Sequence, residues 1–95
     1  MSEQNRITVY GDENCAYCAA ARMLFARKGV RFEDVVVTKD ASKFTEMEAR
    51  SGRRSVPQIF VGDNHVGGFD ELCSLDKSGE LDKLLAEPRG GDNSL

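Results

Sequence analysis

The chain has 95 residues, of which 40% are hydrophobic and 31% charged, and its formal net charge is −3 at pH 7. This length fits one domain with a single modest core, which we expect over residues 1–87. The small negative charge argues against nucleic-acid binding, which relies on dense Lys and Arg patches, and no apolar run approaches the roughly 20 residues that a membrane-spanning helix needs.

The cysteines and the N-terminal segment indicate the compartment. The first six residues contain neither a basic segment nor an apolar segment of a signal peptide. Three cysteines, Cys15, Cys18 and Cys73, make an odd number that does not suggest a disulfide-stapled secreted protein. A zinc site needs further ligands at matching spacing, and the sequence offers only His65 in addition. We therefore expect a cytoplasmic protein without a metal site.

The first predicted elements are a strand and a helix. Residues 7–10 (ITVY) are rich in β-branched and aromatic types and end at Gly11, which indicates a short strand. A helix is expected to begin near Cys15 and to run to Lys28, because residues 16–28 contain neither Gly nor Pro, and Gly29 provides its stop. The spacing of four residues predicts its buried face: Cys18, Ala21, Leu24 and Phe25.

The middle of the chain predicts a second strand and a second helix. Residues 30–37 form the strand, and the run Val35-Val36-Val37 is typical of a central parallel strand that is buried on both faces. Asp40 is a suitable cap for a helix that runs to about Arg50. Its expected buried pair is Phe44 and Met47.

The last third predicts a hairpin and two helices. Residues 58–61 form a strand after Pro57, and the turn at 62–64 leads into a short strand at 65–66. Helices are expected over residues 69–77 and 80–87. The second of these helices presents three leucines on one side: Leu81, Leu84 and Leu85. Residues 88–95 are polar and are predicted to be a disordered tail.

The order of these elements predicts the fold. A helix between the first two strands makes them parallel through a right-handed crossover, whereas the last two strands form an antiparallel hairpin. The result is a four-stranded mixed sheet with helices on both faces, which is the layout of a thioredoxin-like α/β domain.

The position of the Cys-x-x-Cys motif predicts redox chemistry. Cys15 falls at the start of a helix, where unpaired N–H groups and the helix dipole favour an anion. Such surroundings lower a cysteine pKa and maintain a thiolate, which is the form that attacks disulfides. Cys18, one turn later on the apolar face, is close enough to form a disulfide with Cys15. Asp12 and Glu13 oppose the thiolate, but we expect the helix terminus to outweigh them.

Three motifs together resemble the glutaredoxin family, in particular the small bacterial dithiol members. They are Cys15-Ala16-Tyr17-Cys18, Ser55-Val56-Pro57 before a strand, and Gly67-Gly68-Phe69-Asp70 before a helix. The stretch from Arg50 to Phe60 is also similar, and the resemblance extends over residues 7–85. It implies a glutathione-dependent thiol–disulfide oxidoreductase with Cys15 and Cys18 as its catalytic residues.

The resemblance also implies a glutathione groove beside Cys15. Pro57 is the expected cis-proline, and the backbone of Val56 pairs with the cysteinyl part of glutathione. Gly68 allows close approach, Asp70 meets the γ-glutamyl end, and Arg53 contacts the glycyl carboxylate. The implied groove consists of seven residues: Tyr17, Arg53, Val56, Pro57, Gly68, Phe69 and Asp70.

Two positions depart from the family pattern. Asp12 stands where many members have Lys, which removes a cation near the thiolate and the glycyl carboxylate, a role that Arg53 can take over. Ala16 replaces the usual proline of the redox motif. In the family, some motifs without this proline hold a [2Fe–2S] cluster between two monomers, with glutathione as an additional ligand, and Cys15 would then be the protein ligand.

The favoured function is the reduction of protein disulfides and of glutathione mixed disulfides by a monomer. Two alternatives stay open: a redoxin that thioredoxin reductase reduces, and an iron–sulfur carrier that would be a cluster-bridged dimer. Other residues have structural interpretations. We expect Arg54 to be a solvated or ion-paired charge, His65 to be a structural or exposed residue, and Cys73 to be a buried free cysteine.

Overall fold

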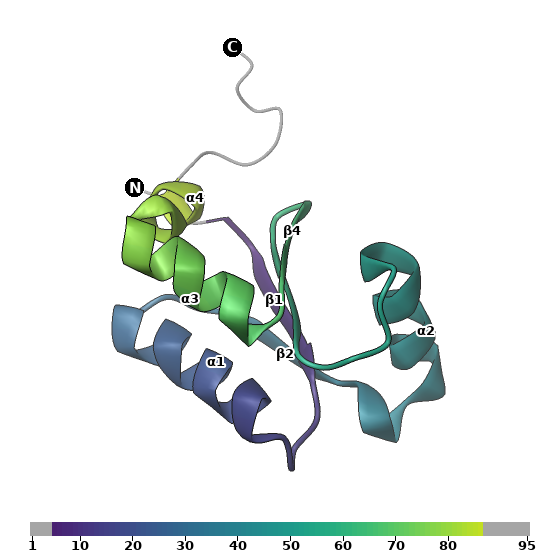
Figure 1. Cartoon of the computed structure of the whole chain (residues 1–95). Coiled ribbons are helices and arrows are strands. Elements are labelled where there is room, and N and C mark those ends of the chain that lie inside the picture. The colour runs from purple at the N-terminus through teal and green to yellow at the C-terminus, as the bar shows by residue number, and fades with distance from the viewer. Residues whose placement is uncertain (1–4, 87–95) are drawn as a thin grey trace.

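The computed structural model describes residues 5–86, so the predicted tail at 88–95 lies outside the described residues. Figure 1 shows the arrangement of the elements. They are, in chain order, β1 (Ile7–Gly11), α1 (Ala16–Lys28), β2 (Glu33–Val36), the 3-10 turn η1 (Val37–Lys39), α2 (Ala41–Ser51), β3 (Gln58–Val61), β4 (Asn64–Gly67), α3 (Phe69–Ser78) and α4 (Glu80–Ala86). Within the described part of the chain, no helix has the length and apolarity that crossing a membrane requires.

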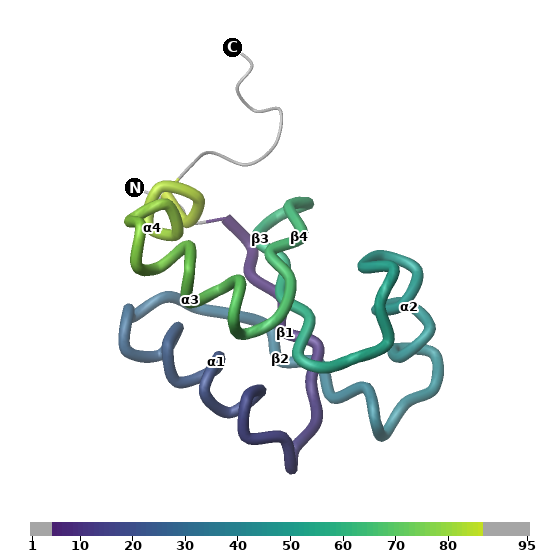
Figure 2. Tube along the Cα trace, viewed as in Figure 1, coloured from purple at the N-terminus to yellow at the C-terminus, as the bar shows by residue number. Residues whose placement is uncertain are grey.

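The strands form one mixed sheet in the order β2-β1-β3-β4. β1 runs parallel to β2 and antiparallel to β3, and β3 pairs antiparallel with β4 through a register shift between Ile59 and Phe60. The traces in Figure 2 place α1 and α3 on one side of the sheet and α2 on the other. The predicted four-stranded mixed sheet with helices on both faces is therefore confirmed.

Each face of the sheet has its own core. The larger core lies under α1, α3 and α4, and it includes the predicted buried residues Leu24, Phe25, Leu81 and Leu85. The smaller core lies under α2: it contains Tyr10, Val37, Met47 and Phe60, with Phe44 packed against it. Burial of apolar surface on both faces fixes the sheet between its two layers of helices.

The prediction for the second strand is wrong in its residue range and in its position within the sheet. β2 begins only at Glu33, ends at Val36 and pairs with β1 alone, so it is an edge strand rather than a central one. Its exposed acidic residues suit an edge, which charged side chains protect from pairing with other chains. Val37 is buried because η1 turns it into the core under α2, and the valine run therefore continues into the core as a turn and not as a strand.

The helix ends follow the predicted caps. The Asp40 side chain accepts a hydrogen bond from the Ser42 N–H at 3.0 Å and so caps α2. Gly29 ends α1 with a φ of 73°, a left-handed conformation that glycine adopts at little cost. α2 is further tied to the sheet by Tyr10, whose hydroxyl donates to Glu46 and accepts from Arg50 Nη1 at 2.8 Å.

We expect Met47→Ala to lower the free energy of unfolding by about 2–5 kcal/mol, because Met47 is fully buried in the small core under α2. Met23→Ala is the matched control. Met23 lies on α1 with 58% of its surface exposed, so its loss should change the stability by less than about 0.5 kcal/mol. Urea unfolding of both variants measures the difference, and equal midpoints would contradict this account of the core.

Candidate active site

Cys15 is the N-cap residue of α1, at the end of the turn that leaves β1. Its backbone is extended (φ −94°, ψ 121°), and its sulfur accepts a hydrogen bond from the Cys18 N–H at 3.3 Å. The first turn of α1 contains no acidic residue. The sulfur thus occupies the position that a Ser or Asp oxygen takes at most helix starts, where the N–H groups and the dipole stabilise an anion.

Several groups act on the pKa of Cys15. Burial alone raises it, but hydrogen bonds from the Cys18 thiol and from the N–H groups of Cys18 and Tyr17 lower it, whereas the charge of Asp12 raises it. The net result is a pKa below the ordinary thiol value. This agrees with the prediction that the helix terminus outweighs the acidic neighbours, and it makes Cys15 the thiol of the pair that ionises more readily.

Cys18 differs from Cys15 because it is fully buried. Burial and the neighbouring Cys15 sulfur raise its pKa to about 11, although the Asp12 N–H and the charge of Arg22 lower it in part. Its sulfur accepts a hydrogen bond from the Asp12 N–H at 3.4 Å. The two free thiols therefore form an asymmetric pair in which Cys15 ionises first and Cys18 keeps its proton.

Both acidic residues of the turn have partners of their own close by. The Asp12 carboxylate accepts hydrogen bonds from the Asn14 N–H at 3.3 Å and from the Thr38 hydroxyl at 3.2 Å. Glu13 forms an ion pair with Lys39 at 3.1 Å. Thr38 and Lys39 belong to η1 and reach the turn only through the path of β2 and η1, so no local sequence pattern predicts these contacts.

The Val56-Pro57 peptide bond is cis, as the resemblance implied. Gln58, the next residue, is buried and supports this loop: its amide nitrogen donates to the Ser55 carbonyl at 3.0 Å, and its amide oxygen lies 2.7 Å from His65 Nε2. His65 also stacks on Phe60 with ring centroids 4.8 Å apart. His65 is therefore a structural residue, as predicted.

The start of α3 lies against the proline loop. A Cβ atom built on Gly68 would lie 3.6 Å from the Pro57 carbonyl oxygen, so the two backbones are close neighbours. The rings of Tyr17 and Phe69 lie 6.1 Å apart and join the start of α1 to the start of α3. The structure thus brings together the motifs around Tyr17, Pro57 and Gly68 at one end of the sheet (Figure 1), with Asp70 exposed beside them.

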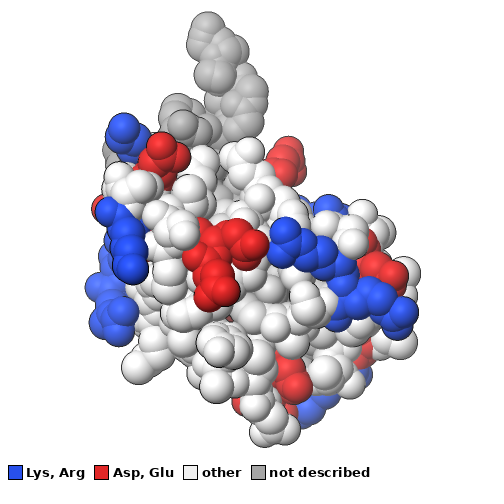
Figure 3. All heavy atoms as spheres, viewed as in Figure 1, with Lys and Arg blue, Asp and Glu red and all other residues white. Residues whose placement is uncertain are grey.

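Glu71 organises the start of α3 and was not among the predicted site residues. One carboxylate oxygen accepts a hydrogen bond from the Gly68 N–H at 2.7 Å, and the other lies 3.7 Å from Arg53 Nη1. Acidic atoms lie beside a basic stripe on this face in Figure 3. Glu71 thus supplies one half of a capping box, but Gly68 has no side chain for the other half, so the usual Ser/Thr-x-x-Glu signature is absent from the sequence.

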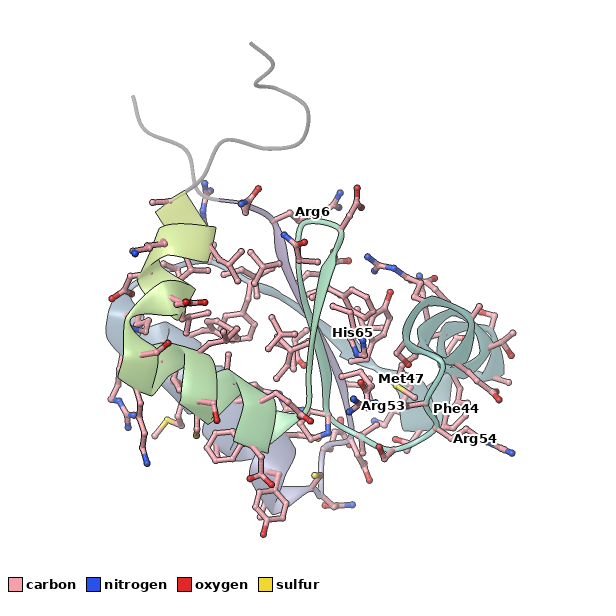
Figure 4. The ribbon with its side chains drawn as sticks, turned by 45° about the horizontal axis from the view of Figure 1, so that its top comes forward. Arg6, Phe44, Met47, Arg53, Arg54 and His65 are labelled. Atoms are coloured by element: carbon pink, nitrogen blue, oxygen red, sulfur yellow. The ribbon has the colours of Figure 1, made fainter. Side chains whose placement is uncertain are left out.

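The two neighbouring arginines of the loop differ in their surroundings. Figure 4 shows Arg53 between the β-hairpin and α2, whereas Arg54 points away from the sheet. Arg54 lies 3.9 Å from Glu48 and against the Phe44 ring, so it is an ion-paired surface residue as predicted. Cys73 is half-buried on α3, which corrects the expectation that it is buried.

We expect two thiol titrations in a reduced Cys73→Ser background, followed by thiolate ultraviolet absorbance. Cys15 should ionise below the ordinary thiol pKa, and Cys18 should ionise near pH 11. Cys15→Ser should remove the titration step at the lower pH. Asp12→Asn should lower the pKa of Cys15 further because it removes a nearby negative charge, whereas Glu13→Gln, the control, should not. A Cys15 pKa at or above the ordinary value would contradict the site geometry.

Comparisons with known proteins agree with this geometry. A model of the glutaredoxin family matches residues 7–66. Glutaredoxin 3 of Escherichia coli (strain K12) is 46% identical over 79 residues, which cover 83% of this chain and 95% of that protein. The solution structure of the glutaredoxin from Brucella melitensis has a TM-score of 0.77 at 42% identity, over 88% of this chain and 91% of the other. The crystal structure of a buckwheat glutaredoxin–glutathione complex has a TM-score of 0.78 at 26% identity, over 85% and 76% of the two chains. The family match includes β1, the thiol-bearing start of α1 and the cis-proline loop, and the chain belongs to the glutaredoxin family.

Proposed function

We propose that the protein is a glutathione-dependent oxidoreductase that reduces protein disulfides and glutathione mixed disulfides. The observation that carries this proposal is the hydrogen-bonded Cys15 sulfur at the start of α1, whose pKa is below the ordinary value. The buckwheat relative, whose crystal structure is a complex with glutathione, supports glutathione as the co-substrate.

The chemistry follows from the asymmetry of the two thiols. The Cys15 thiolate attacks the glutathione sulfur of a mixed disulfide, and the substrate leaves as a thiolate that takes up a proton. A second glutathione thiolate then attacks the Cys15 adduct, releases oxidised glutathione and restores the Cys15 thiolate. With a protein disulfide, Cys18 instead attacks the mixed disulfide on Cys15, and glutathione reduces the resulting Cys15–Cys18 disulfide.

The proposed glutathione groove lies between the proline loop and the start of α3. The Val56 backbone would pair with the cysteinyl part of the ligand, next to Pro57 and the close approach at Gly68. The first turn of α3, with Asp70, would hold the γ-glutamyl end, and Arg53 would hold the glycyl carboxylate. Tyr17 and Phe69, whose rings are in contact, would form the wall next to the sulfur.

This chain would hold a [2Fe–2S] cluster only if the cluster were shared between two chains. Among residues 5–86, no group of three or more His, Cys, Asp or Glu side chains is placed to hold a metal ion. Cys15 is the accessible thiolate of the site and Cys18 is buried, so one chain would supply one sulfur and the other ligands would come from a second chain and from glutathione. Anaerobic reconstitution with iron and sulfide tests this alternative. The second alternative, a redoxin that thioredoxin reductase reduces, is tested by an assay with thioredoxin reductase as the electron donor.

Cys18→Ser should keep most of the activity on glutathione mixed disulfides and lose the reduction of protein disulfides in the dithiol cycle. The reason is that the first reaction needs only Cys15, whereas the second needs an intramolecular attack. Glutathione-coupled turnover on a mixed disulfide and on a protein disulfide measures the two activities, and Cys73→Ser is the control that removes a thiol away from the motif. An equal loss of both activities would refute this division.

Arg53→Gln should raise the KM for a glutathione mixed disulfide by about three- to tenfold with little change in kcat, because an exposed charge-assisted contact to the glycyl carboxylate is lost. Arg54→Gln removes the same charge one residue away, from a side chain that points out of the site, and should keep the wild-type KM. If the two variants had the same KM, Arg53 would not bind the ligand.

A further inference from the structure

The guanidinium of Arg22 is held by two hydrogen bonds beside the turn between β1 and α1. Its Nη2 donates to the Asp12 carbonyl at 3.0 Å, and its Nε donates to Asp34 Oδ1 on β2, also at 3.0 Å. Only 21% of the side chain is exposed. An arginine held by a backbone carbonyl and a carboxylate has little conformational freedom, so its charge stays in one place.

The Arg22 guanidinium lies close to the Cys18 sulfur. Asp12 links the two groups, because its carbonyl accepts from Arg22 and its N–H donates to Cys18 Sγ at 3.4 Å. Gly11 provides the space: a Cβ atom built on it would lie 2.9 Å from Cys18 Sγ and 3.4 Å from Arg22 Nη2. The sulfur and the guanidinium therefore border the same small space, which is open because residue 11 has no side chain.

We propose that Arg22 is a positioning residue for the second step of the dithiol cycle: it fixes the turn that holds the Cys18 sulfur and stabilises the thiolate that Cys18 must form to resolve a mixed disulfide on Cys15. This inference rests on the proposed function. It assigns a role to a residue four positions after Cys18 that no sequence motif contains.

The charges around Cys18 change during the reaction in a way that favours this role. In the reduced protein, burial and the Cys15 sulfur raise the pKa of Cys18, and the Asp12 N–H and Arg22 lower it. When Cys15 is in a mixed disulfide, it carries no charge. The groups left to act on Cys18 are then the Asp12 N–H and the Arg22 guanidinium, with Asp34 as the counter-charge on β2. Burial still raises the pKa of Cys18 in this intermediate, and Arg22 is the cation among the groups that lower it.

The step balances without any other reactant. The Cys18 thiol gives its proton to water, and the thiolate attacks the Cys15 sulfur. The bond between Cys15 and the substrate sulfur breaks, the Cys15–Cys18 bond forms, and the substrate sulfur leaves as a thiolate that takes up a proton. The cysteine pair is oxidised by two electrons and the substrate disulfide is reduced by two.

The test follows this step alone in a Cys73→Ser background. Reduced protein is mixed with oxidised glutathione, quenched with acid at set times, and analysed by mass spectrometry for the Cys15 adduct and for the intramolecular disulfide that replaces it. The rate of replacement is measured against pH. Arg22→Gln should move the midpoint of this profile upward by about half to one pH unit, which makes resolution roughly three- to tenfold slower at pH 7 and slows it more than adduct formation.

Three further variants separate charge from scaffolding. Arg22→Lys keeps the charge and should recover most of the wild-type midpoint, whereas Arg27→Gln removes an exposed charge from the last turn of α1 and should have the wild-type profile. Asp34→Asn breaks the ion pair but keeps the guanidinium, so its midpoint should stay at or below that of the wild type. Arg22→Lys and Asp34→Asn still test the proposal if Arg22→Gln does not fold.

Two results would overturn the inference and leave the proposed function intact. One is a wild-type profile for Arg22→Gln with normal adduct formation. The other is an upward shift of the same size in Arg22→Lys and in Asp34→Asn, which would mean that the ion pair acts only as a scaffold. If the wild-type protein formed no adduct with oxidised glutathione, the proposed function itself would fail, and this inference would fail with it.

Discussion

The hydrogen bond from the Cys18 N–H to the Cys15 sulfur is the contact on which the site depends. It forms because the chain leaves β1 through a short turn and places Cys15, in an extended conformation, at the N-cap of α1. The same contact therefore does two things: it satisfies an N–H group that the helix leaves unpaired, and it lowers the pKa of the thiol. Structure and reactivity cannot be separated here, since a change that removes the cap also removes the stabilisation of the anion.

The difference between the two sulfurs arises from their depth. Cys15 is the N-cap residue at the rim of α1, whereas Cys18 lies within the helix on the side that faces the core, so one sulfur is half-buried at the helix start and the other is fully buried. Burial raises the pKa of Cys18, so Cys18 keeps its proton at a pH where Cys15 ionises. Gly11 contributes to this arrangement because a side chain there would collide with the buried sulfur.

Local patterns in the sequence predicted the parts of this structure that local physics determines. The strand before Gly11, the cap at Asp40 and the end of α1 at Gly29 each depend on residues within one turn, and each is found as predicted. The run Val35-Val36-Val37 was misinterpreted because its apolar pattern does not say whether the chain stays in the sheet, and the core under α2 decides that outcome for Val37. Contacts between elements, such as those of Arg22 with Asp34 and of Arg53 with Glu71, depend on how α1, β2 and α3 are placed, which no short pattern encodes.

The acidic character of the turn is compatible with a reactive thiolate because each carboxylate has a local partner. Glu13 is paired with Lys39, and Asp12 accepts hydrogen bonds from the Thr38 hydroxyl and the Asn14 N–H. Exposed pairs of this kind add little to stability, and the Asp12 charge still raises the pKa of Cys15. The stabilisation of Cys15 comes instead from hydrogen bonds donated by the Cys18 thiol and by the N–H groups of Cys18 and Tyr17, whose effect is stronger at short range than that of a solvated carboxylate. The chain can therefore have Asp12 three residues before Cys15 and still have a thiol pKa below the ordinary value.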